Sequence, residues 1–211
     1  MEVKSEQIVF VVDDDPSMRA ALTNLFRSMI LDVKVFSSAA ELLQSELPQI
    51  PSCLVLDIRL PGVSGLEFQD NLARAGIHIP IVFMTGHGDI PMSVRAMKAG
   101  AIDFLPKPFR DQDMLDAVIR ALSQDRKRRD GDKAVSRLRQ LFETLTPRER
   151  EVLTHVTAGL MNKQIAHTLQ VSEITVKIHR GAAMHKMGAR TYAELVRMAD
   201  VLKPNLRKLG R

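Results

Sequence analysis

Short apolar runs alternate with amphipathic stretches throughout residues 7–122. Runs of four or five apolar residues are typical of strands buried on both faces of a sheet, and the stretches between them have the apolar period of helices. This alternation favours parallel strands joined by helical crossovers, so we predict an α/β doubly wound, five-stranded parallel sheet. The predicted strands are Ile8–Val12, Val33–Phe36, Cys53–Leu56, Ile81–Met84 and Ala101–Leu105. The predicted helices are Pro16–Ile30, Ala39–Leu47, Leu66–Ala75, Met92–Ala99 and one that starts at Asp111.

Polar side chains stand where four of these strands end. Asp13 and Asp14 follow the first strand, Asp57 the third, Thr85 the fourth and Lys107 the fifth. The carboxyl ends of parallel strands meet at one edge of a sheet, so we expect these groups to converge there. A carboxylate pair suits a divalent cation, and a lone Asp beside a Lys and a hydroxyl suits the acceptance of a phosphoryl group.

A less specific interpretation of the three consecutive aspartates, Asp13 to Asp15, stays open at this point. Carboxylates are ordinary at the N-terminus of a helix, where they cap free backbone N–H groups. A single Lys at position 107 is likewise more often a surface side chain. The functional interpretation depends on all of these groups meeting at one place.

Charge is unevenly distributed along the 211 residues. Residues 1–125 carry 11 Lys and Arg against 17 Asp and Glu, whereas residues 126–211 carry 19 against 8. An acidic half joined to a strongly basic half suggests two domains, and the basic one is suited to a polyanion such as nucleic acid.

Several classes of protein are excluded by the sequence. Cys53 is the only cysteine, so the chain forms no internal disulfide and no thiolate metal site, and we expect this thiol to be buried. The first residues lack the layout of a signal peptide, and no apolar run approaches the ~20 residues of a membrane-spanning helix. We therefore expect a cytoplasmic protein with no membrane partner.

The composition changes over residues 123–143, which we interpret as a linker. A charge run over residues 125–130 is followed by Gly131-Asp132 and then by an amphipathic, helix-like Ala134–Phe142. We expect this linker to be solvated and partly helical. A helical signalling shaft or a dimerisation stem is the alternative interpretation.

The chain from Thr146 onward is predicted to be helical. Thr146 to Glu149 has the layout of a capping box, and Gln170 to Ser172 forms a short turn between two helices. A helix, a short turn and a second helix that starts at a Ser cap are typical of a helix-turn-helix, so we predict an all-α domain of this kind over residues 144–211. Its predicted helices are Arg150–Ala158, Asn162–Leu169, Glu173–Met187 and Thr191–Val201.

Four motifs stand in order at the strand ends of the first half: Val12–Asp15, Leu56–Gly62, Met84–Gly86 and Phe104–Phe109. Together they resemble the receiver domain of bacterial response regulators over residues 6–122, so residues 1–122 are assigned to such a domain. Two further motifs, Gly86–Asp89 and Met97–Ala101, suggest the FixJ-type branch of these regulators.

The resemblance implies that Asp57 accepts a phosphoryl group from a sensor histidine kinase with the help of Mg²⁺. In this family Asp14 and Asp57 would bind the metal directly, Asp13 would bind it through water, and the backbone carbonyl of Arg59 would complete the protein ligands. Such a site needs few protein oxygens, because Mg²⁺ keeps several of its waters.

The resemblance also implies how the phosphoryl group is reported. Lys107 would pair with one phosphoryl oxygen, and the Thr85 hydroxyl would move to donate to another. Phe104 would then swing into the vacated space and remodel the face formed by Met92–Ala99 and Ala101–Leu105. In FixJ-type proteins that face forms the homodimer.

Three segments of the basic half resemble the LuxR-type helix-turn-helix over residues 144–204: Leu145–Leu153, Asn162–Ala166 and Val171–Arg180, followed by Lys186–Thr191. By the resemblance, Glu173–Met187 would be the recognition helix in the major groove of DNA. Residues implied to contact bases are Lys177, Ile178 and Gly181, with Arg180 nearby. Residues implied to contact phosphates are Asn162, Lys163, Thr175 and Lys186.

Two residues depart from the pattern of this family. Gly181 stands where a longer polar side chain is often found, and Met161 replaces the usual Ser at a helix cap. Apolar residues at helical spacing are expected to form the core of this domain: Ile165, Ala166, Leu169, Ile174, Val176, Met184 and Met187.

We expect a phosphorylation-dependent transcriptional regulator, an activator in this branch, that dimerises and binds double-stranded promoter DNA, with RNA polymerase as a further partner. One alternative is a phosphorylation-independent DNA-binding protein with a vestigial receiver, which the complete set of receiver residues disfavours. A second is a hydrolase of the haloacid dehalogenase type, but those enzymes need an Asp where Arg59 stands. We therefore do not expect an enzyme.

Overall fold

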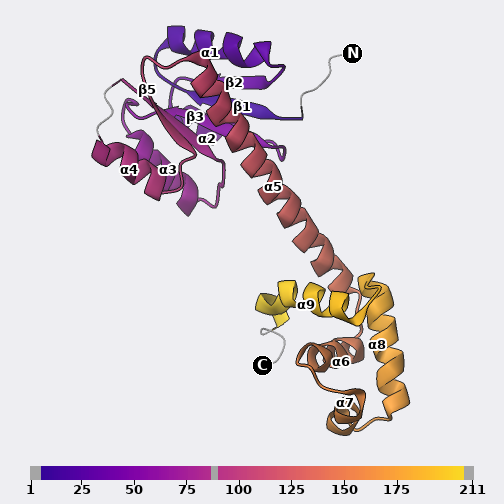
Figure 1. Ribbon diagram of the computed structural model, residues 1–211. Coiled ribbons are helices and arrows are strands. Elements are labelled where there is room, and N and C mark those ends of the chain that lie inside the picture. Colours follow the sequence, from indigo (N-terminus) through magenta and orange to yellow (C-terminus); the bar gives the residue numbers. More distant parts are fainter. Residues whose placement is uncertain (1–5, 87–89, 207–211) are drawn as a thin grey trace. The chain divides into compact units, whose positions relative to one another are not determined.

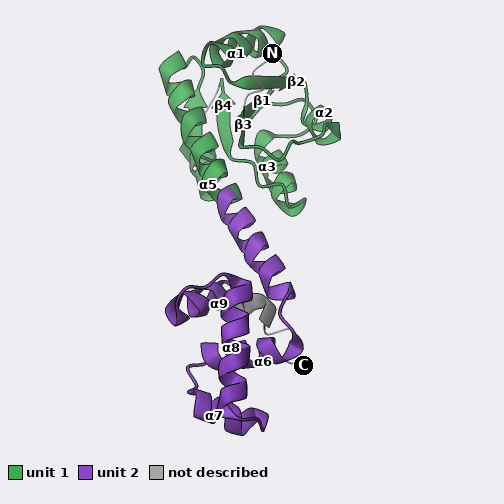
Figure 2. Ribbon diagram, turned by 90° about the vertical axis from the view of Figure 1, so that its right-hand side faces the viewer, with its two compact units in different colours: residues 1–129 green, residues 130–211 purple. Residues whose placement is uncertain are grey.

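The chain divides into two compact units, residues 1–129 and 130–211 (Figure 2). The computed structural model describes residues 6–86 and 90–206. Most of the motif Gly86–Asp89 and the outer ends of the two predicted domains therefore lie outside the described residues. Within the described part of the chain, no helix combines the length and the apolar character needed to cross a membrane.

Unit 1 contains the predicted parallel sheet, with five strands in the order β2-β1-β3-β4-β5 (Figure 1). The strands are β1 Ile8–Val12, β2 Asp32–Phe36, β3 Ser52–Asp57, β4 Ile81–Thr85 and β5 Asp103–Pro106. Because β1 pairs with β2 on one side and with β3 on the other, the chain winds in both directions from the middle of the sheet. The prediction of a doubly wound sheet is therefore confirmed.

Helices cover both faces of this sheet. They are α1 Pro16–Ser28, α2 Ala39–Gln44, α3 Gly65–Arg74, α4 Ile90–Lys98 and α5 Asp111–Glu143. Successive strand residues point to opposite faces, so Val9 and Val11 pack with α1 and α5. Phe10 and Val12 pack on the other face with α2, α3 and α4. The inner strands β1, β3 and β4 are thus buried on both sides, which is why their sequences are mainly apolar.

Polar caps begin the helices of unit 1. The side chain of Asp15 accepts the Ser17 N–H at the start of α1, and Ser38 caps α2 in the same way. Ser64 forms a capping box with Glu67 at the start of α3. These contacts satisfy backbone donors that have no partner within the helix.

Backbone hydrogen bonds at the ends of helices explain why some elements end earlier or start later than predicted. α1 stops at Ser28 because the N–H of Ile30, in a left-handed conformation with φ 58°, folds back onto the Arg27 carbonyl. The Ala101 N–H donates to the Ala96 carbonyl and so closes α4 instead of starting β5. Such turns are set by backbone bonds that a hydrophobic pattern does not report.

The helix α5 is continuous over 33 residues and belongs to both units. Side chains between Met114 and Leu122 lie in the core of unit 1, and Phe142 lies in the core of unit 2. Residues 123–143, predicted to be a helical linker of which only part was expected to be helix, are therefore helical throughout, with no break at Gly131. A glycine inside a helix costs about 1 kcal/mol, which the many backbone bonds of a long helix outweigh.

Asp125 also departs from the expected solvated charge run, because its side chain is fully buried. Its carboxylate accepts the backbone N–H of Ser52 at 2.9 Å and pairs with the guanidinium groups of Arg128 and Arg129, each at 2.6 Å. Burial opposes the negative charge, but these hydrogen bonds outweigh it, so the pKa of Asp125 is lowered. The carboxylate thus fastens α5 to the start of β3.

The described part of unit 2 is helical, as predicted. After α5 it contains α6 Pro147–Thr157, α7 Asn162–Leu169, α8 Glu173–Met187 and α9 Tyr192–Leu206. Thr146 and Glu149 form the predicted capping box of α6, and the Ser172 hydroxyl accepts the Thr175 N–H at the start of α8. The core contains the expected Ile165, Ala166, Val176 and Met187 side chains. In contrast, Ile174 is 69% exposed, so its assignment to the core was wrong.

We predict that Asp125→Asn lowers the free energy of unfolding of unit 1 by about 3 kcal/mol at pH 7, because Arg129 loses the charge of a buried partner. The folded-state pKa of Asp125 is depressed, so its contribution is present above about pH 4 and is lost as the pH falls further. The difference between the two proteins should therefore shrink in acid.

The single thiol gives a local measurement of this effect. Cys53 is fully buried in unit 1, so its labelling during urea unfolding with a dipyridyl disulfide, which also reacts in acid, follows the opening of that unit. Asp130→Asn, on the neighbouring exposed stretch of α5, is the matched control. Equal unfolding curves for Asp125→Asn and wild type at pH 7 would contradict the anchoring role.

Candidate functional sites

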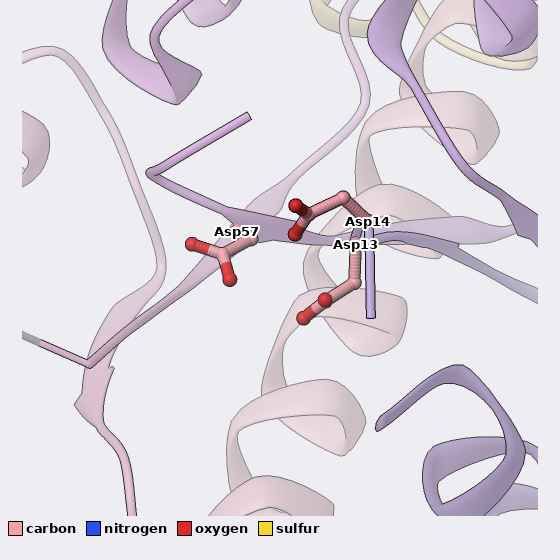
Figure 3. A group of neighbouring side chains, drawn as sticks. All are labelled: Asp13, Asp14 and Asp57. Carbon is pink, nitrogen blue, oxygen red and sulfur yellow. The ribbon is translucent and has the colours of Figure 1, made fainter. Parts of the chain in front are cut away.

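The ends of β1 and β3 bring the predicted acidic residues together. These strands are neighbours in the sheet, and Val12 lies opposite Leu56, so Asp13 and Asp57 stand at the next positions along. The direction of winding reverses between these two strands, and ligand crevices of open α/β sheets lie at such points. Figure 3 shows the side chains of Asp13, Asp14 and Asp57 gathered there.

These three carboxylates form a group suited to a divalent cation. They can offer oxygens that all lie within 4.8 Å of one another, with Asp13 and Asp57 buried and Asp14 exposed. Burial raises the pKa of Asp13 and the Asp57 carboxylate acts in the same direction, although hydrogen bonds from Lys107 and the Asp15 N–H offset part of this. A compact set of carboxylates with excess negative charge fits Mg²⁺. Arg59 lines the same open hollow as Asp14.

Lys107 joins the two buried carboxylates. Its Nζ donates to Asp13 Oδ2 at 2.7 Å and to Asp57 Oδ2 at 2.6 Å. Partial burial opposes the ammonium charge, but the two carboxylates outweigh it, so the pKa of Lys107 is raised and the side chain stays charged. The backbone N–H of Lys107 donates to the Thr85 carbonyl at 2.7 Å, which ties the lysine to the end of β4.

A supporting residue that the sequence did not single out is Arg19. Its Nη1 donates to the backbone carbonyls of Asp13 and Asp14 at 2.7 and 2.9 Å. Arg19 lies in the first turn of α1, so these bonds attach the acidic loop to that helix. Asp15 points away from the cluster and caps α1 through the Ser17 N–H. Of the three consecutive aspartates, the third therefore has the helix-capping role, and the first two belong to the cluster.

The orientation of Asp57 depends on the loop that follows β3. Its Oδ1 accepts the backbone N–H of Arg59 at 2.8 Å, while the Gly65 N–H donates to the Ile58 carbonyl at 2.8 Å. A Cβ at Gly65 would lie only 2.7 Å from the Asp57 carbonyl oxygen, so no larger residue fits without a backbone shift. α3 can therefore start against the end of β3, and Gly65 is a second residue that sequence reasoning missed.

The two predicted switch residues lie on adjacent strands. Thr85 ends β4 and is fully buried, and Phe104 in β5 is half-buried. Phe104 lies opposite Phe83, and residues two apart share a face, so Thr85, Phe83 and Phe104 point to the same side of the sheet. That side is covered by α4, whose Met92 and Ala96 pack in the same cluster.

Unit 2 presents the predicted recognition helix with one face open. α7 ends at Leu169 with Gln170 as its C-cap, in a left-handed conformation with φ 53°, and α8 starts at Glu173 after its Ser172 cap. Lys177, Ile178 and Gly181 are all exposed on α8. The residues predicted to contact bases are therefore accessible.

The predicted phosphate-contacting residues differ in their surroundings. Lys163 is exposed on α7, whereas Asn162 accepts a hydrogen bond from Arg180 at 3.1 Å, which links the start of α7 to α8. The Thr175 hydroxyl lies 2.9 Å from the hydroxyl of Ser172. Asn162 thus helps to join α7 to α8, and Thr175 takes part in the cap of α8.

Lys186, also predicted to contact phosphate, has a partner inside its own domain. Its Nζ donates to Glu149 Oε2 at 2.7 Å and to the Thr144 carbonyl at 3.3 Å. Burial opposes the charge on Glu149, but the bonds from Lys186 and the Thr146 N–H outweigh it and lower the pKa of Glu149. Only the folded domain brings position 186 to the capping box of α6.

Both halves of the chain match established families. Residues 9–119 match the response regulator receiver domain, and residues 143–199 match the luxR family of bacterial regulatory proteins. Receiver domains bind Mg²⁺ at an acidic pocket and work with histidine kinases, and a luxR-type domain binds DNA. The fold and these matches define the class: a response regulator that controls transcription.

Whole-length relatives carry the same two domains. Nodulation protein W of Bradyrhizobium diazoefficiens is 61% identical over 201 residues, which is 95% of this chain and 88% of that protein. Response regulator protein TodT of Pseudomonas putida is 44% identical over 94% of this chain and 88% of its own length. The solved structure of the response regulator StyR is 49% identical with a TM-score of 0.83, covering 93% of this chain and 99% of that one. The chain belongs to the FixJ-type response regulators with a luxR-family DNA-binding domain.

We predict that Lys186→Ala lowers the free energy of unfolding of unit 2 by about 2 kcal/mol, because it leaves the buried Glu149 carboxylate without its charged donor. Tyr192 is the only tyrosine and the chain has no tryptophan, so tyrosine fluorescence in urea follows unit 2 alone. Lys163→Ala, at an exposed lysine, should change this free energy by less than about 0.5 kcal/mol. Unchanged unfolding of Lys186→Ala together with uniformly weaker DNA binding would instead support a phosphate contact.

Proposed function

We propose that this protein accepts a phosphoryl group on Asp57 from a histidine kinase and then controls a promoter as a homodimer. The observation that carries this proposal is the contact of Lys107 Nζ with both Asp13 and Asp57. It places a positive charge beside Asp57, the last residue of the central strand β3. Asp57 is held from the other side by the Arg59 N–H, so it is oriented before any substrate arrives.

In the proposed step, an Asp57 oxygen attacks the phosphorus of a phosphohistidine. An acyl phosphate O–P bond forms, the N–P bond breaks, and the histidine leaves with its electron pair and takes up a proton. Lys107 loses one carboxylate charge as a partner and gains the phosphoryl oxygens in its place. Phosphoryl transfer needs little from a protein beyond such positioning and charge neutralisation.

The proposed metal ligands are Asp14 and Asp57, Asp13 through water, and the carbonyl of Arg59. Bound Mg²⁺ would neutralise phosphoryl charge and orient the oxygens for in-line transfer. Arg19 contributes by holding the backbone of Asp13 and Asp14, so that the acidic loop keeps its shape whether or not the charge is balanced.

Dimerisation is proposed to follow from a change on the face that contains α4. The phosphoryl group adds about two negative charges, and a hydrogen bond to such a group is worth about 1.5–3 kcal/mol, which shifts a two-state equilibrium about ten- to a hundredfold. Thr85 would donate that bond, and Phe104, on the same side of the sheet, would follow. An apolar stripe on α4 supports this face as the contact, since Ile90, Val94 and Met97 are 80%, 43% and 45% exposed.

DNA binding is proposed to use α8 as the recognition helix, with Lys177, Ile178 and Arg180 near the bases. Lys163 would contact phosphate. The net positive charge of residues 126–211 supports this use of the domain. We further propose that the protein acts in the cytoplasm as an activator that contacts RNA polymerase, as the FixJ-type resemblance implies.

We predict that Asp57→Asn gains no phosphoryl mass when incubated with acetyl phosphate and Mg²⁺, because the amide is not a nucleophile for this transfer. Intact mass spectrometry measures the label. Asp15→Asn is the matched control, since Asn caps a helix as well as Asp does, and it should label like wild type. Chelation of Mg²⁺ should stop labelling of the wild type. Normal labelling of Asp57→Asn would show that the acceptor lies elsewhere.

Thr85→Ala should still be phosphorylated, but labelling should raise its dimer association constant at least about tenfold less than it raises that of the wild type, because the bond from the hydroxyl is lost. The hydroxyl is proposed to report the phosphoryl group and takes no part in its transfer. Sedimentation velocity before and after labelling measures the dimer fraction, and Thr85→Ser should restore the response. A wild-type response in Thr85→Ala would remove this residue from the switch.

The dependence of DNA affinity on salt concentration and on DNA sequence should distinguish phosphate contacts from base contacts. Lys163→Ala is expected to weaken binding equally on all sequences and to reduce the slope of log K against log salt by about one unit. Lys177→Ala should cost about 1–3 kcal/mol on the specific site and relax discrimination there. Fluorescence anisotropy on specific and random duplexes tests both. If Lys177→Ala loses the same affinity for each, Lys177 only neutralises phosphate.

A further inference from the structure

The exposed face of α8 carries two large aliphatic side chains that its own domain does not cover. Ile174 is 69% exposed and Ile178 is 64% exposed. They are four residues apart, so they lie side by side on the helix surface, with about 5–6 Å between their Cβ atoms. Both lie in the first turns of the predicted recognition helix, the part that faces the base edges in a helix-turn-helix.

The geometry of the helix places Ile174 at the centre of the open face. Each residue turns the helix by about 100°, so Lys177, Ile178, Gly181 and His185 all fall within about 60° of the direction of Ile174. All four are exposed. The buried residues Val176, Ala183 and Met187 fall on the opposite side, about 180–220° away.

The surroundings of the pair indicate nucleic acid as its occupant. Lys177 stands between the two isoleucines in sequence and is exposed beside them, and Lys163 is exposed on α7. Gly181, one turn further along, has open space where a Cβ would lie, so no side chain projects from the helix there. A helix that combines an apolar pair with flanking cations on a strongly basic domain suits a groove lined by phosphates and floored by bases.

We propose that Ile174 and Ile178 together read thymine through its 5-methyl group in the major groove. This inference rests on the proposed DNA binding and adds Ile174, which the sequence had placed in the core. Thymine is the base that presents a methyl group in this groove, whereas cytosine presents an amino group that an aliphatic side chain would leave without a partner. Because base pairs are stacked about 3.4 Å apart, the two side chains would contact thymines about two base-pair steps apart.

The test removes single methyl groups from the DNA. Binding sites are selected from random duplexes with the full-length protein, with and without acetyl phosphate and Mg²⁺, and each dT of the selected site is then replaced in turn by dU. Wild type should lose about fourfold in affinity at each contacted thymine, the effect of one buried methyl group. Ile174→Ala should lose this sensitivity at one thymine and Ile178→Ala at another, about two steps away.

The ratio of dT to dU affinity is the decisive measurement, because general effects on folding or dimerisation cancel in it. Val201→Ala, at an exposed aliphatic residue of α9, is the matched control and should keep the wild-type ratios. The proposal is overturned if no dU substitution weakens wild-type binding by more than twofold, or if Ile174→Ala keeps every wild-type ratio.

Two further outcomes have distinct meanings. Altered sedimentation of Ile174→Ala with wild-type dT to dU ratios would assign this face to protein contact, and would overturn the proposal. Failure of the wild type to select any DNA sequence would instead contradict the proposed DNA-binding function on which this inference rests.

Discussion

The contact of Lys107 Nζ with Asp13 and Asp57 is the interaction on which the receiver half depends. It joins Asp13, which follows β1, and Asp57, which ends β3, to Lys107, which follows β5. The ammonium charge balances two buried carboxylates that would otherwise repel each other. The same lysine is tied through its backbone N–H to the end of β4, where Thr85 is buried. Lys107 therefore connects the proposed phosphoryl acceptor, the proposed metal site and the strand that carries the proposed switch hydroxyl.

Much of the remaining structure holds this small site in position. Arg19 fixes the carbonyls of the acidic loop, and Gly65 lets α3 start against the end of β3. At the opposite end of the sheet, Asp125 binds α5 to the first residue of β3 through the Ser52 N–H. The strand that carries Asp57 is thus held at both ends by polar contacts, in addition to its burial between the two hydrophobic cores.

In the DNA-binding half, polar and apolar side chains have roles that differ from what their types suggest. Lys186, a basic residue near the end of the recognition helix, stabilises the capping box of α6 through Glu149. Ile174, an aliphatic residue, is open to solvent. A cation in a basic domain can thus have a partner within the protein, and a helical apolar period does not bury every isoleucine.

The sequence by itself determined the alternation of strands and helices, the strand-end positions of Asp13, Asp14, Asp57 and Lys107, and the helix-turn-helix with its Ser172 cap. These features are local, because they depend on the period of apolar residues and on cap residues next to each helix. Only folding in three dimensions brings Lys107 to Asp13 and Asp57, buries Asp125 against Ser52, and pairs Lys186 with Glu149. It also decided that Ile174 faces outward, although its residue type favoured the core. The partners in these contacts come from elements far apart in the chain, and no local pattern records which side chains folding will bring within hydrogen-bonding distance.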